Sequence, residues 1–156
     1  MDTLIASRAR IINVASLAHA LTASFTYPRQ NDPARYNKDT AYADSKMANI
    51  FFTMELERRF GPKGVHAYAL HPGFVVSELM KHTPWLLLQL LPPLQYFTFK
   101  TSLEGAQTTL FCALSDAAIP GGYHSDSQPW PTTAAAKDAA KARWLWEESE
   151  RITKLK

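Results

Sequence analysis

Two residues of one short segment, Tyr42 and Lys46, have the types and the spacing to do acid–base chemistry. In a helix, residues four apart share a face, so a phenol and an ammonium group can point at one small ligand. A phenol has an ordinary pKa of about 10, and a nearby ammonium favours its phenolate form. Ser16 closes an apolar run upstream and could hold the oxygen of the same ligand. Together the three side chains could move a proton to or from that oxygen while a hydride joins or leaves its carbon.

The four-residue spacing does not identify this site by itself, because Tyr96 and Lys100 repeat it inside an apolar stretch. The context favours Tyr42, which begins an amphipathic pattern after one apolar run and before a second run that ends in Pro72-Gly73. Tyr96, in contrast, follows a Pro-Pro break. The alternative interpretation of Tyr42 is a tyrosine at a helix N-terminus beside a solvated lysine.

The elements that must position these side chains follow from the apolar patterns. Residues 10–15 form a β-branched apolar run that predicts a buried parallel strand, and residues 19–40 are polar and turn-forming, which indicates a long surface excursion. Helical spacing of apolar residues predicts a helix over 42–60, ended by the turn residues 61–64. A second apolar run at 65–70 predicts another strand, so the three elements form a right-handed βαβ unit.

The rest of the chain continues the alternation of helices and strands. Thr101 and Glu104 have the spacing of a capping box, which predicts a helix from there to about residue 114. Gly121-Gly122 indicates a turn into a short last strand. Residues 134–154 predict a closing helix, whose expected packing residues are Trp144, Leu145, Ile152 and Leu155. The fold class is therefore α/β.

Composition limits the classes of function. With 156 residues, 46% of them hydrophobic and 20% charged, the chain is expected to fold as one globular domain. The net charge of +3 is scattered along the chain, so no nucleic-acid partner is expected. The apolar segment 85–99 is too short to span a bilayer.

Cysteine and histidine usage argues against a metal site. Cys112 is the single cysteine, which excludes an intrachain disulfide and favours a reducing compartment; we expect it to be a buried apolar residue. The five histidines lack ligand spacing and clustered carboxylates, so no metal site is expected. They are His19, His66, His71, His82 and His124.

Three segments, at 10–19, 42–49 and 70–79, together resemble the short-chain dehydrogenase/reductase superfamily. They read Arg-Ile-Ile-Asn-Val-Ala-Ser-Leu-Ala-His, Tyr-Ala-Asp-Ser-Lys-Met-Ala-Asn and Leu-His-Pro-Gly-Phe-Val-Val-Ser-Glu-Leu. Residues 100–107 and 146–153 are similar to its retinol dehydrogenase-like and WW-domain-oxidoreductase-like branch. The resemblance implies that residues 1–156 form one partial domain, the C-terminal part of a Rossmann-type doubly wound parallel sheet. It also implies that the N-terminal nucleotide-binding half is absent, because no Gly-rich phosphate turn occurs in the sequence.

The resemblance assigns roles to individual residues. Ser16 would orient the substrate oxygen, Tyr42 would be the general acid/base, and Lys46 would support Tyr42 and bind the cofactor ribose. The cofactor would be NADP or NAD, with NADP slightly favoured. Its implied binding residues are Tyr42, Lys46, Pro72, Gly73, Val75 and Ser77, although the family more often has Thr in place of this serine.

The resemblance also suggests partners and leaves alternatives open. Residues 78–100 would form a flap over a small lipophilic substrate of retinoid or steroid type, although simple packing or peripheral membrane contact could also explain this apolar segment. The helix at 42–60 could pair two copies in a homodimer. A cytoplasmic or membrane-associated location would fit. The alternative function is a truncated, non-catalytic remnant or interaction module of the family.

Overall fold

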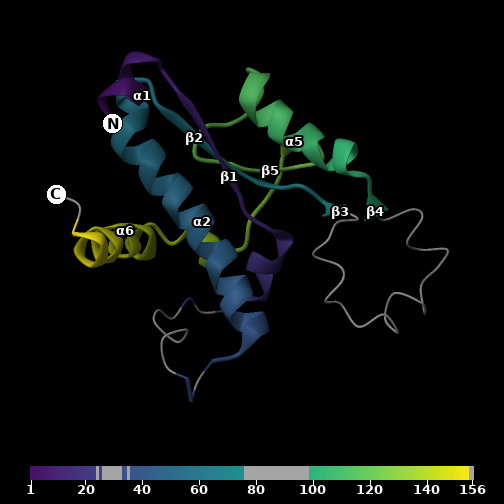
Figure 1. The fold of residues 1–156 in the computed structure, drawn as a ribbon, viewed down its shortest axis with the longest axis vertical. Helices are drawn as coiled ribbons and strands as arrows, with labels where there is room; N and C mark the ends of the chain where they lie inside the picture. The colour runs from purple at the N-terminus through teal and green to yellow at the C-terminus, as the bar shows by residue number, and fades with distance from the viewer. Residues whose placement is uncertain (24, 26–32, 35, 76–98, 155–156) are drawn as a thin grey trace.

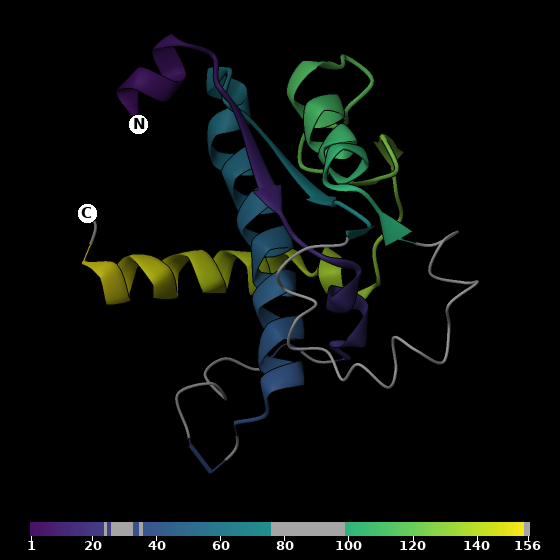
Figure 2. The ribbon, with the colours of Figure 1, turned by 45° about the vertical axis from the view of Figure 1, so that its right-hand side comes forward.

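A computed structural model describes residues 1–23, 25, 33–34, 36–75 and 99–154 of the chain. It confirms the α/β class: a mixed sheet lies between helices on its two faces (Figures 1 and 2). The sheet order is β1 (Arg10–Val14), β2 (His66–His71), β5 (Tyr123–Ser125) and β6 (Gln128–Pro129). The helices are α1 (Asp2–Ala6), α2 (Lys38–Phe60), α5 (Ser102–Leu114) and α6 (Ala139–Thr153), with 3₁₀ helices η1 (Leu17–Leu21), η3 (Gly61–Lys63) and η5 (Ala135–Lys137).

The first βαβ unit has the predicted parallel pairing. Strands β1 and β2 run in register from Arg10 opposite His66 to Val14 opposite Leu70, and β2 pairs in parallel with β5. The expectation that β1 is fully buried is wrong, because its residues are half-buried and the side chain of Val14 is 47% exposed. The cause is the position of β1 at the end of the sheet order, where it pairs only with β2 among the described residues.

Helix α2 begins four residues before the position that the apolar pattern indicates. The side-chain oxygen of Asn37 accepts hydrogen bonds from the backbone N–H groups of Asp39 and Thr40, at 3.0 and 3.1 Å. Asparagine is among the best N-cap residues, and an apolar periodicity cannot reveal a polar first turn. Tyr42 therefore lies in the second turn of α2, where backbone hydrogen bonds to preceding residues are already established.

The side of the sheet that faces α2 holds the larger hydrophobic cluster. Met47 and Phe51 of α2 are completely buried, and they pack with Ala69 of β2 and Tyr123 of β5. Phe25 closes the cluster with its ring edge-on to Phe51, at a centroid distance of 5.3 Å. This cluster joins the helix that carries Tyr42 to the strands beneath it.

The opposite side of the sheet packs against α5. The predicted capping box is present: the hydroxyl of Thr101 accepts from the backbone N–H of Glu104, whose carboxylate accepts from the backbone N–H of Thr101. Cys112 of α5 is completely buried in the second cluster, with Tyr68 and Leu70 of β2. Burial raises the pKa of the Cys112 thiol to about 11, so the thiol is neutral and this cysteine is a packing residue.

Helix α6 is shorter than predicted and packs through other residues. It begins at Ala139, because the Asp138 carboxylate accepts from two backbone N–H groups of the first turn. Leu145 packs against the α2 cluster as expected, whereas Trp144 and Ile152 are 42% and 50% exposed. Instead, Trp146 stacks on Phe52 of α2 at a centroid distance of 5.4 Å. The fourth expected packing position, residue 155, lies outside the described residues.

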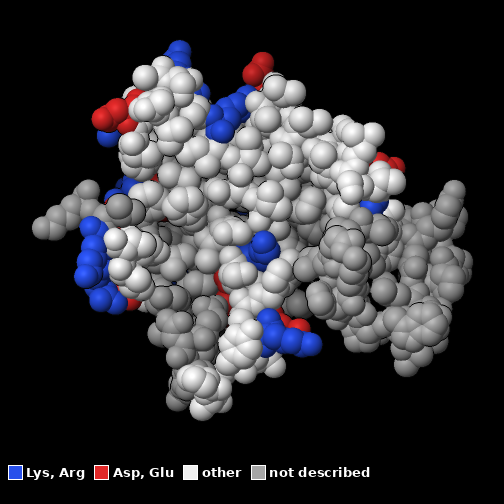
Figure 3. Space-filling view, in the orientation of Figure 1, with Lys and Arg blue, Asp and Glu red and all other residues white. Residues whose placement is uncertain are grey.

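One face of the molecule, seen in Figure 3, carries dispersed charge. On the face shown in Figure 3, Lys and Arg side chains are separated by uncharged surface. Within the described ranges, no helix combines the length and the apolar character that crossing a bilayer requires.

Candidate functional site

Ser16 lies just beyond the carboxyl end of β1, where it caps the 3₁₀ helix η1. Its hydroxyl oxygen accepts a hydrogen bond from the backbone N–H of Ala18 at 3.2 Å. Because the oxygen accepts in this bond, the hydroxyl hydrogen can still be donated to a ligand oxygen. The imidazole Nδ1 of His19 lies 2.7 Å from the carbonyl oxygen of Ser16, which ties the first turn of η1 to this residue.

Tyr42 and Lys46 approach the same end of β1 from helix α2. The ammonium nitrogen of Lys46 lies 5.5 Å from the centroid of the Tyr42 ring, as expected for side chains one helical turn apart. The same ammonium donates to the carbonyl oxygen of Val14 at 3.4 Å, two residues before Ser16. Tyr42 is 44% exposed, so a ligand can reach its hydroxyl. The structure therefore brings Ser16, Tyr42 and Lys46 to the carboxyl end of β1.

Two polar residues that the sequence analysis did not single out hold α2 in this position. Asp44 is buried, and its carboxylate accepts from the Thr22 hydroxyl at the end of η1, at 3.0 Å. Asn49 donates from its side-chain nitrogen to the carbonyl of Val14 at 3.1 Å, the same oxygen that Lys46 contacts. Both residues lie within the segment from Tyr42 to Asn49. Their closeness in the sequence to Tyr42 and Lys46 is the signal by which the sequence could have identified them.

The segment after β2 contains the predicted cofactor-binding residues. Pro72 and Gly73 connect β2 to β3 (Phe74–Val75), which pairs in parallel with β4 (Phe99–Lys100). Gly73 has φ +91°, a conformation that residues with a Cβ rarely adopt, so the backbone here favours glycine. The side chain of Val75 packs against the Cα of Gly105 in α5. Ser77 and nearly all of the expected flap at 78–100, including Tyr96, lie outside the described residues.

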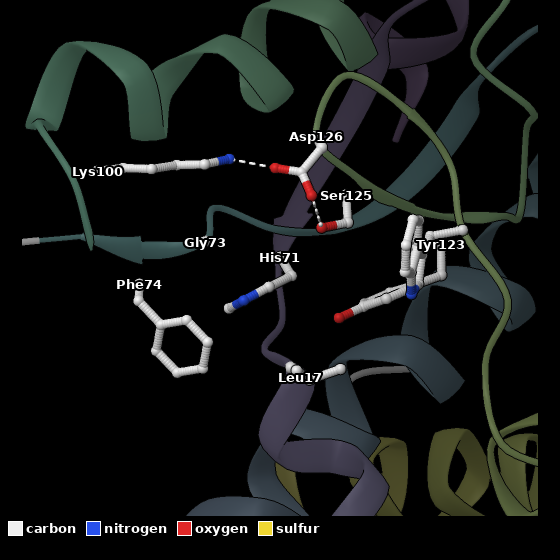
Figure 4. Close-up of a pocket in the computed structure, with 9 residues that line it drawn as sticks. Leu17, His71, Gly73, Phe74, Lys100, Tyr123, Ser125 and Asp126 are labelled. Atoms are coloured by element: carbon white, nitrogen blue, oxygen red, sulfur yellow. Dashed lines mark hydrogen bonds and ion pairs between the residues drawn. The ribbon is translucent and has the colours of Figure 1, made fainter. Parts of the chain in front are cut away.

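A pocket of about 200 Å³ lies at the carboxyl ends of β2 and β5 (Figure 4). In open α/β sheets, ligands bind outside the carboxyl ends of the strands, so a ligand is expected at this position. Among the described residues that line it, His71, Tyr123 and Ser125 are buried, and Lys100 forms an ion pair with Asp126 in its wall. The sequence analysis considered His71 only as a metal ligand and did not predict this pocket. Its lining residues are Leu17, His71, Gly73, Phe74, Lys100, Tyr123, Ser125, Asp126 and Trp130.

Burial sets the charge state of two histidines near the carboxyl ends of β2 and β5. Removal from water lowers the pKa of His71 and of His124, because it disfavours the charged imidazolium. The neutral form of His124 also satisfies both ring nitrogens: Nδ1 lies 3.1 Å from the Ala69 carbonyl, and Nε2 accepts from the backbone N–H of Ile119 at 3.0 Å. The nearby Lys100 ammonium holds the pKa of Asp126 below its usual value.

These lowered pKa values predict that the chain loses stability in mild acid. Below the ordinary histidine pKa of 6.5, the unfolded chain binds protons that the folded chain excludes from His71 and His124. The contribution of these two histidines to the free energy of unfolding is therefore complete above pH 6.5. It falls as the pH drops toward their pKa values in the folded chain, by at most about 1.4 kcal/mol per pH unit for each histidine. Urea titrations between pH 7.5 and 5.5 measure this slope. The double variant His71→Gln/His124→Gln should flatten it, and an unchanged slope in that variant would contradict the assignment.

The described residues contain no group of three or more His, Cys, Asp or Glu side chains that could hold a metal ion. The groups that the structure brings together have the chemistry for proton transfer at Tyr42 and for a hydrogen bond from Ser16 to the same ligand oxygen.

Comparison with curated proteins identifies close relatives of nearly the whole chain. Human "Retinol dehydrogenase 12" is 39% identical over 149 residues, which cover 93% of this chain and 46% of that protein. Human "Dehydrogenase/reductase SDR family member 13" is 38% identical over 151 residues, which cover 94% of this chain and 40% of that protein. The chain thus spans less than half the length of these relatives. No family model matches the chain.

Solved structures share the fold. A crystal structure of an uncharacterized protein from Mycobacterium paratuberculosis has a TM-score of 0.68 at 29% identity, covering 94% of this chain and 50% of that one. NADPH-bound carbonyl reductase from chicken fatty liver has a TM-score of 0.53 at 19% identity, covering 79% of this chain and 42% of that one. The sheet order and the strand–helix–strand unit correspond to part of a Rossmann-type fold. The chain therefore belongs to the short-chain dehydrogenase/reductase family, in its retinol dehydrogenase-like branch.

Proposed function

We propose that this chain supplies the proton-transfer half of an NAD(P)-dependent oxidoreductase that interconverts a hydroxyl and a carbonyl group. The observation that carries the proposal is the position of Lys46, whose ammonium contacts both the Tyr42 ring and the end of β1, beside Ser16. In alcohol oxidation, the Tyr42 oxygen accepts the hydroxyl proton while Ser16 donates a hydrogen bond to the substrate oxygen. In carbonyl reduction, the Tyr42 hydroxyl returns that proton to the same oxygen.

The proposed cofactor is NADP or NAD, with NADP slightly favoured. When bound, a nicotinamide ring supplies or accepts the hydride. Lys46 would hold its ribose and Pro72 and Gly73 would border the ring, with Val75 and Ser77 toward the carboxamide. The residues present fit this role, because Gly73 turns the backbone at the carboxyl end of β2 without a side chain. The NADPH named for the chicken carbonyl reductase supports the preference by analogy of fold.

The proposed substrate is small and lipophilic, of retinoid or steroid type. Leu17, next to Ser16, and Phe74, next to Gly73, both expose apolar side chains at the edge of the sheet that carries the site. Such side chains favour apolar ligands. The name of the human relative, retinol dehydrogenase, supports retinol as the first compound to assay.

Two further contacts are proposed from the same family resemblance. Pairing of two copies through α2 would use its exposed face, which includes Phe52. Peripheral contact with a membrane surface would serve a lipophilic substrate, and it fits either a cytoplasmic or a membrane-associated location. Sedimentation of the chain with and without phosphatidylcholine vesicles tests both contacts.

A chimera tests the proposed activity directly. In it, this chain replaces the matching 149 residues of human retinol dehydrogenase 12. We expect the chimera to oxidise retinol with NADP and to produce reduced cofactor in equal amount. A folded chimera that binds NADP but transfers no hydride would contradict the proposal and support the alternative, a non-catalytic interaction module.

A further inference from the structure

Two buried polar atoms of the pocket at the ends of β2 and β5 lack hydrogen-bond partners within the described structure. They are Nδ1 of His71 and the hydroxyl oxygen of Tyr123, on residues that are 8% and 4% exposed. A buried polar group without a partner costs about 1–3 kcal/mol. In folded proteins, about nine-tenths or more of buried polar groups have a hydrogen-bond partner. A pair of them in one pocket therefore points to a polar ligand.

The two groups lie in the same space. Both residues line the pocket, and Figure 4 shows the Tyr123 hydroxyl reaching toward the space between His71 and Leu17. The ring of His19 packs edge-on to Tyr123 at a centroid distance of 4.9 Å, which fixes the direction of the phenol. Because Nδ1 of His19 lies within hydrogen-bond distance of the Ser16 carbonyl oxygen, His19 also connects the pocket to η1.

The rest of the pocket favours a neutral ligand with an apolar body. Its other walls include the apolar side chains of Leu17, Phe74 and Trp130. Lys100 and Asp126, the two charged residues among the described ones that line the pocket, form an ion pair with each other, so neither needs a charged ligand. Burial keeps His71 neutral by lowering its pKa, and it raises the pKa of Tyr123, which keeps the phenol protonated.

The size of the pocket limits the body of the ligand. The volume is about 200 Å³. For comparison, a dry cavity of about 150 Å³ in another protein binds benzene. The pocket can therefore hold one six-membered ring with a short substituent.

We propose that this pocket binds the hydroxyl group of a neutral, ring-sized alcohol, which accepts a hydrogen bond from Tyr123 and donates one to Nδ1 of His71. A hydroxyl group suits the two orphan atoms because it is donor and acceptor at once. The proposal goes beyond the proposed function, because neither His71 nor Tyr123 has a role in proton transfer or hydride transfer. The pocket does share Leu17, Gly73 and Phe74 with the proposed substrate and cofactor site.

Ligand-detected NMR on the 156-residue chain tests the proposal with benzyl alcohol and toluene, which differ by one CH₂OH group in place of CH₃. We expect benzyl alcohol to bind about three- to tenfold more tightly than toluene, the size of one or two net hydrogen bonds. Tyr123→Phe should weaken this preference, because only Nδ1 of His71 then bonds to the alcohol, and Tyr123→Phe/His71→Leu should abolish it. Tyr68→Phe, at a buried tyrosine of the other cluster, should leave the preference unchanged. A dispersed ¹H–¹⁵N spectrum confirms that each variant is folded.

Several results would overturn the proposal. These are equal binding of the two compounds by the parent chain, binding of neither to the folded chain, or a preference that is undiminished in Tyr123→Phe. If Tyr123→Phe does not fold, His71→Leu carries the same test, since it removes the other polar partner. Loss of the alcohol preference with Tyr42→Phe would also count against it, because Tyr42 does not line this pocket.

Discussion

Replacing Tyr42 by Phe should lower the kcat of the retinol dehydrogenase chimera by about 10²–10⁴-fold, the usual contribution of a positioned general acid/base. The substitution removes one oxygen and keeps the ring that lies 5.5 Å from the Lys46 ammonium. Tyr42 is also 44% exposed, so the fold does not depend on its hydroxyl. Substrate binding should change little, because the proton moves only during the reaction. Steady-state rates with retinol and NADP measure the effect.

The matched control is Tyr36→Phe, which removes the same atom from an exposed tyrosine just before α2. This variant should keep the rate of the parent chimera. Ser16→Ala should give an intermediate loss, because Ser16 donates a hydrogen bond but does not carry the proton. If Tyr42→Phe retained more than about a tenth of the parental kcat, Tyr42 would not be the acid/base and the proposed function would fail.

Replacing Phe51 by Ala should reduce the free energy of unfolding by about 3–5 kcal/mol. Phe51 is completely buried, contacts Phe25 edge-on, and belongs to the cluster that joins α2 to β2 and β5. Truncation removes its apolar surface from the core and leaves a cavity that helix and strands can fill only in part. Urea denaturation at pH 7.5 measures the loss.

The neighbouring Phe52 provides the control for this effect. It is 43% exposed and stacks on Trp146 of α6, so Phe52→Ala should cost only about 0.5–1.5 kcal/mol. The two substitutions delete the same atoms from adjacent positions of one helix, and only the burial differs. Equal losses in the two variants would mean that the α2 cluster is not the main core of the chain.

Much of the fold was predictable because its signals are local. The β-branched run before Ser16, the helical spacing after Tyr42 and the Thr101–Glu104 capping box each specify an element within a few residues. The parallel pairing of β1 and β2 follows from the helix between them, since a crossover of that kind joins parallel strands. Tyr42 and Lys46 could be assigned to one face because a helix brings residues four apart together whatever surrounds it.

Other features arise only when segments distant in the sequence meet. His71 and Tyr123 lie 52 positions apart in the sequence, and nothing local in either segment indicates a shared pocket. The exposure of Trp144 and the stacking of Trp146 depend on where α6 crosses α2, which a helical pattern does not define. The half-exposed state of β1 likewise follows from its place in the sheet order.

The sequence by itself determined the order of the main strands and helices, the candidate residues for acid–base chemistry, and the family whose motifs they match. Those are properties of spacing along one backbone, where φ and ψ preferences and helical or strand periodicity act over a few residues. Only the tertiary structure decided that Lys46 reaches the end of β1, that Asp44 and Asn49 hold α2 there, and that a pocket lined by Leu17, His71 and Tyr123 opens at the carboxyl ends of β2 and β5. Contacts of this kind depend on how helix and sheet surfaces pack, which is settled by the whole buried interface rather than by any one segment.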